Sequence, residues 1–210
     1  MLRHLIASMC LGVLVTSAAA ECNIDLLKEE IAANDRLQAQ LLASGKPDKE
    51  ALKDLLVQRL KTMNEVRKCA DQGDIEAAYL AGVTFMEHGD RWALSALVAE
   101  NLDNTPRSPW RENVRELYTT AIKYLESAAN KNHFAAMEHL AKTYSADKPG
   151  IGREPDVALE WYARGIKLAL NQRKRMDAVR LFSRMKELDK AHPLTRKAEK
   201  DLYSESSRGN

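Results

Sequence analysis

The chain has 210 residues, of which 45% are hydrophobic, and its 32 Lys and Arg nearly balance its 30 Asp and Glu. A chain of this size and apolar content can bury an ordinary core, which argues against intrinsic disorder. With only 9 Gly and 6 Pro, and with Ala, Leu, Lys, Glu and Arg dominant, the composition is typical of helical proteins rather than sheet sandwiches. We therefore expect an all-α fold.

Residues 1–20 differ in character from the rest of the chain. A short basic start at Arg3 is followed by an apolar run from Leu5 to Val15 and by small residues up to Ala20. This order is typical of a secretory signal peptide that is cleaved after Ala20. No other stretch approaches the roughly 20 apolar residues that a membrane-spanning helix needs. We expect an exported, periplasmic protein without a membrane span.

A lipid anchor is the alternative to weigh at this end of the chain. Bacterial lipidation uses a cysteine that directly follows a small residue, but Glu21 precedes Cys22 and Met9 precedes Cys10. Neither cysteine fits that pattern, so the sequence favours a protein without a lipid anchor.

Residues 21–72 are predicted to form a helical hairpin. Two amphipathic stretches, Ile24 to Ala43 and Asp48 to Ala70, flank a turn at 44–47, with Asp48 placed to cap the second helix. The midpoint between Cys22 and Cys69 falls in this turn, so an antiparallel hairpin would bring the two cysteines together at its open end. We predict a disulfide between them, which exported proteins retain; two unpaired buried thiols are the alternative.

Each helix of this hairpin is expected to carry one apolar stripe. The residues of the two stripes are Ile24, Leu27, Ile31, Ala32, Leu37 and Leu41, then Leu52, Leu55, Leu56, Leu60 and Met63.

Residues 73–166 contain an internal repeat. The pattern of small and aromatic residues that starts at Ala121 recurs at Ala158, a spacing of 37, whereas the pattern that starts at Ala77 recurs at Ala136, a spacing of 59. One period near 37, interrupted once by about 22 residues, explains both spacings and predicts stacked helical hairpins.

These residues resemble the Sel1-like repeat family, which is related to tetratricopeptide repeats. The resemblance covers roughly 121–166 closely and 73–86 in part. It rests on Ala136, Leu140, Ala141, Tyr144, Gly150, Gly152, Asp156, Ala158, Trp161, Tyr162 and Gly165. At Gly165 and Ile166 the pair of small residues usual in the family is only half present. The resemblance implies a solenoid of helical hairpins with a concave surface that binds another protein.

The extra segment, 87–111, is an insertion in the repeats. The simplest interpretation is a lengthened helix with a loop that packs back on the repeats. The alternative is a binding insertion, because insertions in solenoids often contact partners and because aromatic and Arg residues are enriched at interaction hot spots. On that hypothesis the partner-binding residues are Trp92, Arg107, Trp110, Arg111 and Arg115.

Residues 167–210 are predicted to be basic capping helices and a polar tail. From Arg164 onward the chain has 13 Lys and Arg against 6 Asp and Glu, a net of +7. Such a face could meet an acidic partner, phospholipid headgroups or nucleic acid, although an exported protein seldom meets nucleic acid and no aromatic-interleaved basic motif supports stacking on bases. A solvated capping helix is the simplest interpretation.

The sequence lacks the patterns of common catalytic and metal sites. His133 and His139 are six residues apart and are expected to face different directions, so no metal site is predicted. Gly150 and Gly152 lack the Lys and Ser or Thr of a phosphate-binding loop, and no Gly-x-Ser-x-Gly motif occurs. We expect no cofactor, no catalytic residue and no enzymatic activity.

From the resemblance we expect a periplasmic protein-binding module, and an immunity or inhibitor protein that neutralises a toxic effector is favoured. An adaptor or scaffold for envelope secretion or polysaccharide assembly is the first alternative. A β-lactam-binding enzyme is the second, but the relatives that suggest it carry a cysteine pair in every repeat, and this chain has one pair outside the repeats. The oligomeric state is not predicted.

Overall fold

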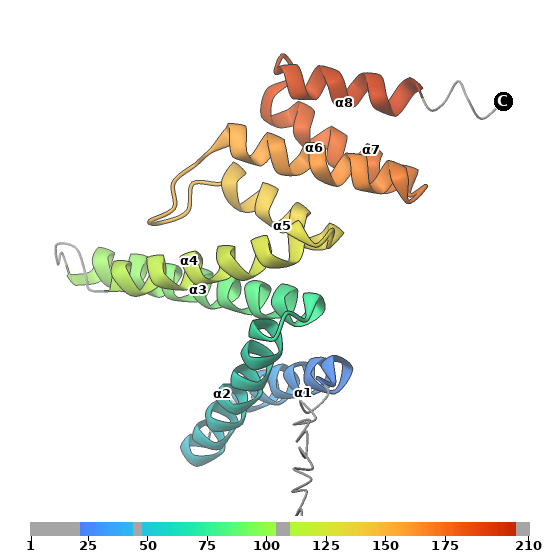
Figure 1. The fold of residues 1–210 in the computed structure, drawn as a ribbon. Helices are drawn as coiled ribbons and strands as arrows, with labels where there is room; N and C mark the ends of the chain where they lie inside the picture. Colours follow the sequence, from blue (N-terminus) through green and yellow to red (C-terminus); the bar gives the residue numbers. More distant parts are fainter. Residues whose placement is uncertain (1–21, 44–47, 104–109, 205–210) are drawn as a thin grey trace, which may run out of the picture.

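The computed structural model describes residues 22–43, 48–103 and 110–204, and for 95–103, 110 and 111 it describes the backbone alone. The signal peptide predicted for 1–20 and the turn predicted at 44–47 lie outside these residues. Within them the chain is helical and has no strand (Figure 1), which confirms the all-α prediction. The helices are α1 (Ile24–Ala43), α2 (Lys49–Asp71), α3 (Ile75–Asp103), α4 (Trp110–Asn130), α5 (Phe134–Ser145), α6 (Pro155–Asn171), α7 (Arg175–Asp189) and α8 (Pro193–Ser204).

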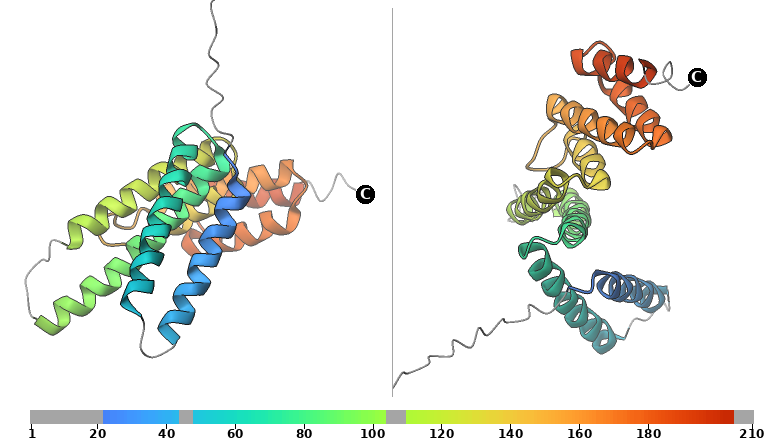
Figure 2. Two further views of the ribbon diagram at one scale, coloured as in Figure 1. Left: turned by 90° about the horizontal axis from the view of Figure 1, so that it is seen from below. Right: turned by 45° about the vertical axis from the view of Figure 1, so that its right-hand side comes forward.

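The helices pair in chain order into hairpins, and each hairpin packs mainly on the next one. The stack follows an open arc, and α1, α3 and α5 lie on its inner side (Figure 2). This arrangement is the predicted solenoid of helical hairpins, in which each unit buries its apolar stripe against its neighbours.

The same tight turn occurs three times between successive hairpins, at residues 69–74, 128–133 and 169–174. In each turn the fifth residue donates its N–H to the carbonyl of the second, and the sixth donates to the first. The fifth residue has a positive φ of 96° at Gly73, 66° at Asn132 and 58° at Arg173, as in the glycine-type ends of many helices. Because the third turn leads into α7, the hairpin stacking continues through α7 and α8, the region described above as capping helices.

The interface between α1 and α2 differs from the predicted stripes. Its residues are spaced alternately by three and four, at 24, 27, 31, 34, 38 and 41 in α1 and at 52, 55, 59, 62, 66 and 69 in α2. This register buries the polar Asn34, Arg59 and Thr62, whereas the predicted core residues Leu37, Leu56 and Leu60 are exposed. The prediction was wrong there because it followed leucines rather than the coiled-coil spacing.

Small residues let the helices of the repeats approach closely. Ala77, Ala81, Ala121, Ala128, Ala136, Ala141 and Ala158 are fully buried. In α3, a Cβ atom at Gly82 would lie 2.6 Å from Leu125 Cγ, and one at Gly89 would lie 2.6 Å from Tyr118 Cε1. Gly82 and Gly89 therefore let α3 pack closely against α4.

The aromatic residues that define the repeat pattern lie mainly in the core. Trp161 and Tyr162 are buried, and Tyr144 is partly buried. At Gly165, where the pattern left the packing uncertain, an added Cβ atom would lie 2.7 Å from Leu181 Cδ1 in α7. Gly165 thus lets α6 approach α7, while the neighbouring Ile166 is buried.

Candidate protein-binding site

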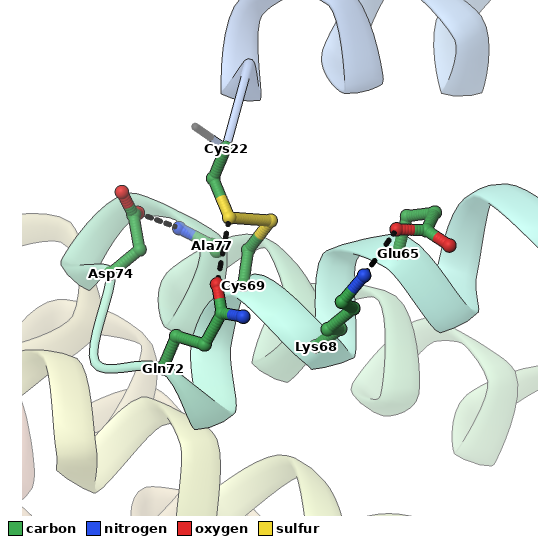
Figure 3. The surroundings of a disulfide bond; sticks show 7 residues. All are labelled: Cys22, Glu65, Lys68, Cys69, Gln72, Asp74 and Ala77. Carbon is green, nitrogen blue, oxygen red and sulfur yellow. Dashed lines mark hydrogen bonds and ion pairs between the residues drawn. A yellow bond between two sulfur atoms is a disulfide. The ribbon is translucent and has the colours of Figure 1, made fainter. Parts of the chain in front are cut away.

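The predicted disulfide closes the first hairpin. Cys22 directly precedes α1 and Cys69 lies in the last turn of α2, with their Cα atoms 5.8 Å apart (Figure 3). Asp74 caps α3 immediately beyond the bond, since its Oδ1 accepts a hydrogen bond of 2.7 Å from Ala77 N. Asp48 caps the other end of α2, where its Oδ1 accepts a hydrogen bond of 3.0 Å from Glu50 N. Side-chain caps therefore fix both ends of the segment 48–74.

The insertion lengthens the hairpin of α3 and α4. α3 runs without a break to Asp103, and α4 begins at Trp110, so most of the insertion is helix that continues the repeat. Tyr118 of α4 lies over Gly89 and donates a hydrogen bond of 2.7 Å to Asp90 Oδ1. Lys148, from the loop between α5 and α6, pairs with the same carboxylate. These contacts hold the two long helices against the next hairpin.

A groove lies where α2, α3 and α4 meet, with a volume of about 400 Å³. Phe85, His88 and Trp92 line it from one face of α3, and Arg67 lines it from α2. The remaining lining residues come from α4 and are Asn113, Glu116, Leu117 and Thr120. Trp92 is 40% exposed, so a large apolar side chain remains accessible to a partner.

The floor of this groove is aromatic and cationic. The Phe85 ring stacks on Tyr124 with centroids 6.0 Å apart, and the Arg67 guanidinium lies 5.7 Å from the centroid of Phe85. Tyr124 is fixed in turn by a hydrogen bond of 3.0 Å to Asp71 Oδ1. An exposed arginine over a partly buried ring is a favourable arrangement.

His88 is a neutral member of the groove. Burial lowers the pKa of His88, and the nearby charges of Arg59 and Arg91 lower it further, whereas the charge of Asp35 opposes them. His88 is therefore neutral at pH 7. The charged side chains that line the groove are Arg67 and Glu116, so it can accept apolar and polar side chains.

Of the two predicted partner-binding residues whose side chains the structure describes, Trp92 lines the groove and Arg115 does not. Arg115 pairs with Glu112 in its own helix and packs its aliphatic chain against Gly150, 2.9 Å from the position of an added Cβ atom. Arg107 lies outside the described residues, and the side chains of Trp110 and Arg111 also lie outside them. The structure therefore does not bring Trp92 and Arg115 together.

The inner side of the arc carries paired charges. Glu76 of α3 bonds both Lys28 of α1 and His133 Nε2, the latter at 2.9 Å. Burial alone would raise the pKa of Glu76, but the hydrogen bonds from Lys28 and His133 hold it below its usual value. Farther along, Glu138 of α5 pairs with Arg180 of α7. These pairs join successive hairpins.

The expected orientation of the two histidines was wrong. The rings of His133 and His139 both contact Tyr79, with centroid distances of 4.4 and 5.6 Å. His133 caps α5 by accepting a hydrogen bond from Ala136 N at Nδ1, so its Nε2 donates to Glu76. In the part of the chain that the structure describes, no group of three or more His, Cys, Asp and Glu could hold a metal ion.

Among residues 22–43, 48–103 and 110–204, no helix has the length and apolar content to cross a membrane. Comparisons with protein-family models, with curated proteins and with solved structures found no match. The Sel1-like resemblance thus stays a prediction that rests on the residues of 121–166.

Sequence analysis did not identify Arg67, Phe85 and His88 as site residues. Phe85 falls in the segment 73–86, which was assigned to the repeat pattern, and His88 was given no role. The signal was present in the spacing of 85, 88 and 92, which places the three side chains on one face of a helix. Arg67 could not be found in this way because it comes from another helix.

Proposed function

We propose that this chain is an exported module that binds a protein, and that the groove of Arg67, Phe85, His88 and Trp92 takes a segment of the partner. The observation that carries the proposal is the groove itself, in which a partly exposed Trp lies beside the contact between Arg67 and the Phe85 ring. Trp and Arg are the residue types on which binding energy concentrates in protein interfaces.

Export is part of the proposal. Its support is the signal-like composition of residues 1–20 and the disulfide that closes the first hairpin, since such bonds persist in oxidising compartments. Within this compartment we favour an immunity protein that captures a toxic effector. The support for this choice is the charge asymmetry along the stack, which accelerates capture of an oppositely charged partner.

A pull-down from a periplasmic extract tests the groove, with the mature protein as bait. We expect Trp92→Ala and Arg67→Ala each to weaken capture of the same polypeptide at least about tenfold. Leu94→Ala is the matched control, because Leu94 is 64% exposed on the same helix and does not line the groove. Unchanged affinity in Trp92→Ala would show that the groove is not the site.

Two further measurements test the class of function. Coexpression with the captured polypeptide should restore growth if that polypeptide is toxic, and Trp92→Ala should abolish the protection. A captured component of an envelope assembly that is not toxic would favour the scaffold instead. Steady turnover of a chromogenic β-lactam by the purified protein would contradict a purely binding function.

A further inference from the structure

The last hairpin, α7 and α8, leaves a groove open at the end of the stack. The groove has a volume of about 440 Å³ and is lined by Val179, Phe182 and Lys186 of α7 and by Leu202 and Tyr203 of α8, among others. Val179 is 39% exposed and Tyr203 59% exposed. Apolar side chains therefore reach the surface at the point where another hairpin would follow in a longer stack.

The repeating turn shows what these positions do elsewhere in the molecule. Tyr79 and Glu138 each stand five residues after the last residue of a turn, and each contacts the next odd-numbered helix or its cap. Tyr79 meets His133 and His139, and Glu138 meets Arg180. Five residues after the third turn stands Val179, which lines the open groove.

A second position agrees with the first. Met86 stands twelve residues after the first turn, and its Sδ atom accepts a hydrogen bond of 3.9 Å from Thr143 Oγ1 in α5. The equivalent residue after the third turn is Lys186, which also lines the groove and lies 5.5 Å from the centroid of the Phe182 ring. In α3 the residues at both positions contact α5, and in α5 the residue at the first position contacts α7. The equivalent residues of α7 line a groove that no described part of the chain fills.

The charge of this end indicates what can occupy the groove. The region from Arg164 onward carries a net charge of +7, and the charged residues that line the groove itself are Arg175, Lys186 and Glu187. Two copies that meet through this region would therefore repel each other. An acidic partner would be attracted, and its apolar stripe would cover Val179 and Tyr203. We propose that the end groove binds an amphipathic helix with acidic flanks, which packs on α7 and α8 as the next helix of the stack. This site shares no residue with the groove of Trp92, so the inference does not depend on the function proposed above.

A synthetic peptide of about 18 residues, long enough to form a helix, provides the probe. It carries a leucine stripe and flanking glutamates, and a matched peptide carries lysines in place of the glutamates. We expect fluorescence anisotropy with the mature protein to show binding of the acidic peptide, weakening with added salt, and no binding of the basic one. Equal binding of both peptides, or of neither, would overturn the proposal.

Substitutions locate the site. Val179→Glu and Lys186→Glu should each weaken binding at least about tenfold. Met176→Glu is the control, because Met176 is 80% exposed on the same helix and does not line the groove; it should change affinity by less than about threefold. Equal losses in Val179→Glu and Met176→Glu would overturn the proposal, and circular dichroism confirms that each variant is folded.

Two other occupants are outcomes of the same experiment. The first is a membrane surface, tested with vesicles of phosphatidylglycerol. If the protein binds these vesicles as tightly as the peptide, if the vesicles displace the peptide and if Val179→Glu abolishes vesicle binding, the surface is a membrane site and the proposal fails. If sedimentation shows a dimer that Val179→Glu dissociates, the occupant is a second copy and the proposal also fails.

Discussion

The interface between α1 and α2 buries Asn34, Arg59 and Thr62, whereas the interface between α3 and α4 consists of small residues, leucine and aromatic rings. In the first hairpin, Arg59 bonds Asp35 at 3.0 Å and Gln38 at 3.1 Å, while Asn34 Nδ2 and Arg59 Nε have no hydrogen-bond partner among the described residues. Buried polar contacts of this kind contribute little net stability.

The first hairpin and the repeats are stabilised by different means. The repeats α3 to α6 are held by close packing of their helices, which removes apolar surface from water. The first hairpin exposes Leu37, Leu56 and Leu60 and compensates with a covalent bond at its open end. The first three predictions below each change one of these means and leave the other intact, and the last concerns an ion pair between hairpins.

Removal of the disulfide should have the largest effect. In the chain-entropy model, the Cys22–Cys69 bond across 47 positions stabilises by about 4 kcal/mol. We expect the double variant Cys22→Ser, Cys69→Ser to lose most of that free energy of unfolding, measured in urea. Hydrogen exchange should locate the loss in α1 and α2, and faster exchange confined to α5 and α6 would contradict this assignment.

Truncation of a repeat core residue should cost nearly as much. Leu140 is fully buried between hairpins, so Leu140→Ala should destabilise by about 3 kcal/mol through lost burial and a residual cavity. Leu60→Ala is the matched control in the first hairpin, where the side chain is 55% exposed, and it should change the free energy by less than about 0.5 kcal/mol. Similar losses for both variants in urea unfolding would remove the distinction between the two regions.

A methyl group at Gly89 should be destabilising although alanine favours helices. The added Cβ would lie 2.6 Å from Cε1 of the buried Tyr118 ring, which its hydrogen bond to Asp90 holds in place. Overpacking of about 1–3 kcal/mol exceeds the gain in helix propensity of about 1 kcal/mol. Thermal unfolding should show a lower Tm for Gly89→Ala. In a Tyr118→Leu background the same substitution should cost less, and an equal cost there would exclude the clash as its cause.

The ion pair between α5 and α7 should give the smallest effect, visible as a pH dependence. Burial alone would raise the pKa of Glu138, but hydrogen bonds from Arg180 and Lys142 lower it. Its contribution is therefore present above the unfolded pKa near 4.5 and is lost as the pH falls through the lower folded value. Glu138→Gln should be less stable than the wild type at pH 7, and the difference should shrink below about pH 4.

The control for this prediction is Glu65→Gln, which removes only an exposed pairing with Lys68 in the same helix. It should leave the stability nearly unchanged at pH 7. A constant difference between Glu138→Gln and the wild type from pH 7 to about pH 3 would contradict the role of the carboxylate.

Sequence alone predicted the helices, the pairing of Cys22 with Cys69 and the stacking of hairpins, because periodicity and chain length determine these features. It missed the burial of Arg59 and Asn34, because a search for apolar residues overlooks polar side chains that follow the same alternation of three and four residues. It also missed that α7 continues the stack, because Arg173 occupies the position that Gly73 and Asn132 take in the other turns.

The candidate site was predicted only in part, through Trp92. Arg67 comes from a different helix, and its approach to Phe85 depends on how α2 and α3 diverge from the turn at Gly73. No spacing within the sequence encodes that angle. Arg115 was predicted to bind a partner because it is an arginine beside the insertion, but its side chain packs on Gly150 instead.

Among the hairpins that the structure describes, the disulfide joins the ends of the first. In a linear array each unit is supported only by the units beside it, so a molecule locked at its N-terminal extremity will fray from the opposite one. α8, with a partner on one side alone, is where amide exchange and proteolysis should begin, and opening should then advance toward the crosslinked hairpin. A helix bound at the C-terminal end would prevent this fraying where it begins. Occupancy of that end would therefore help to determine the protein's lifetime.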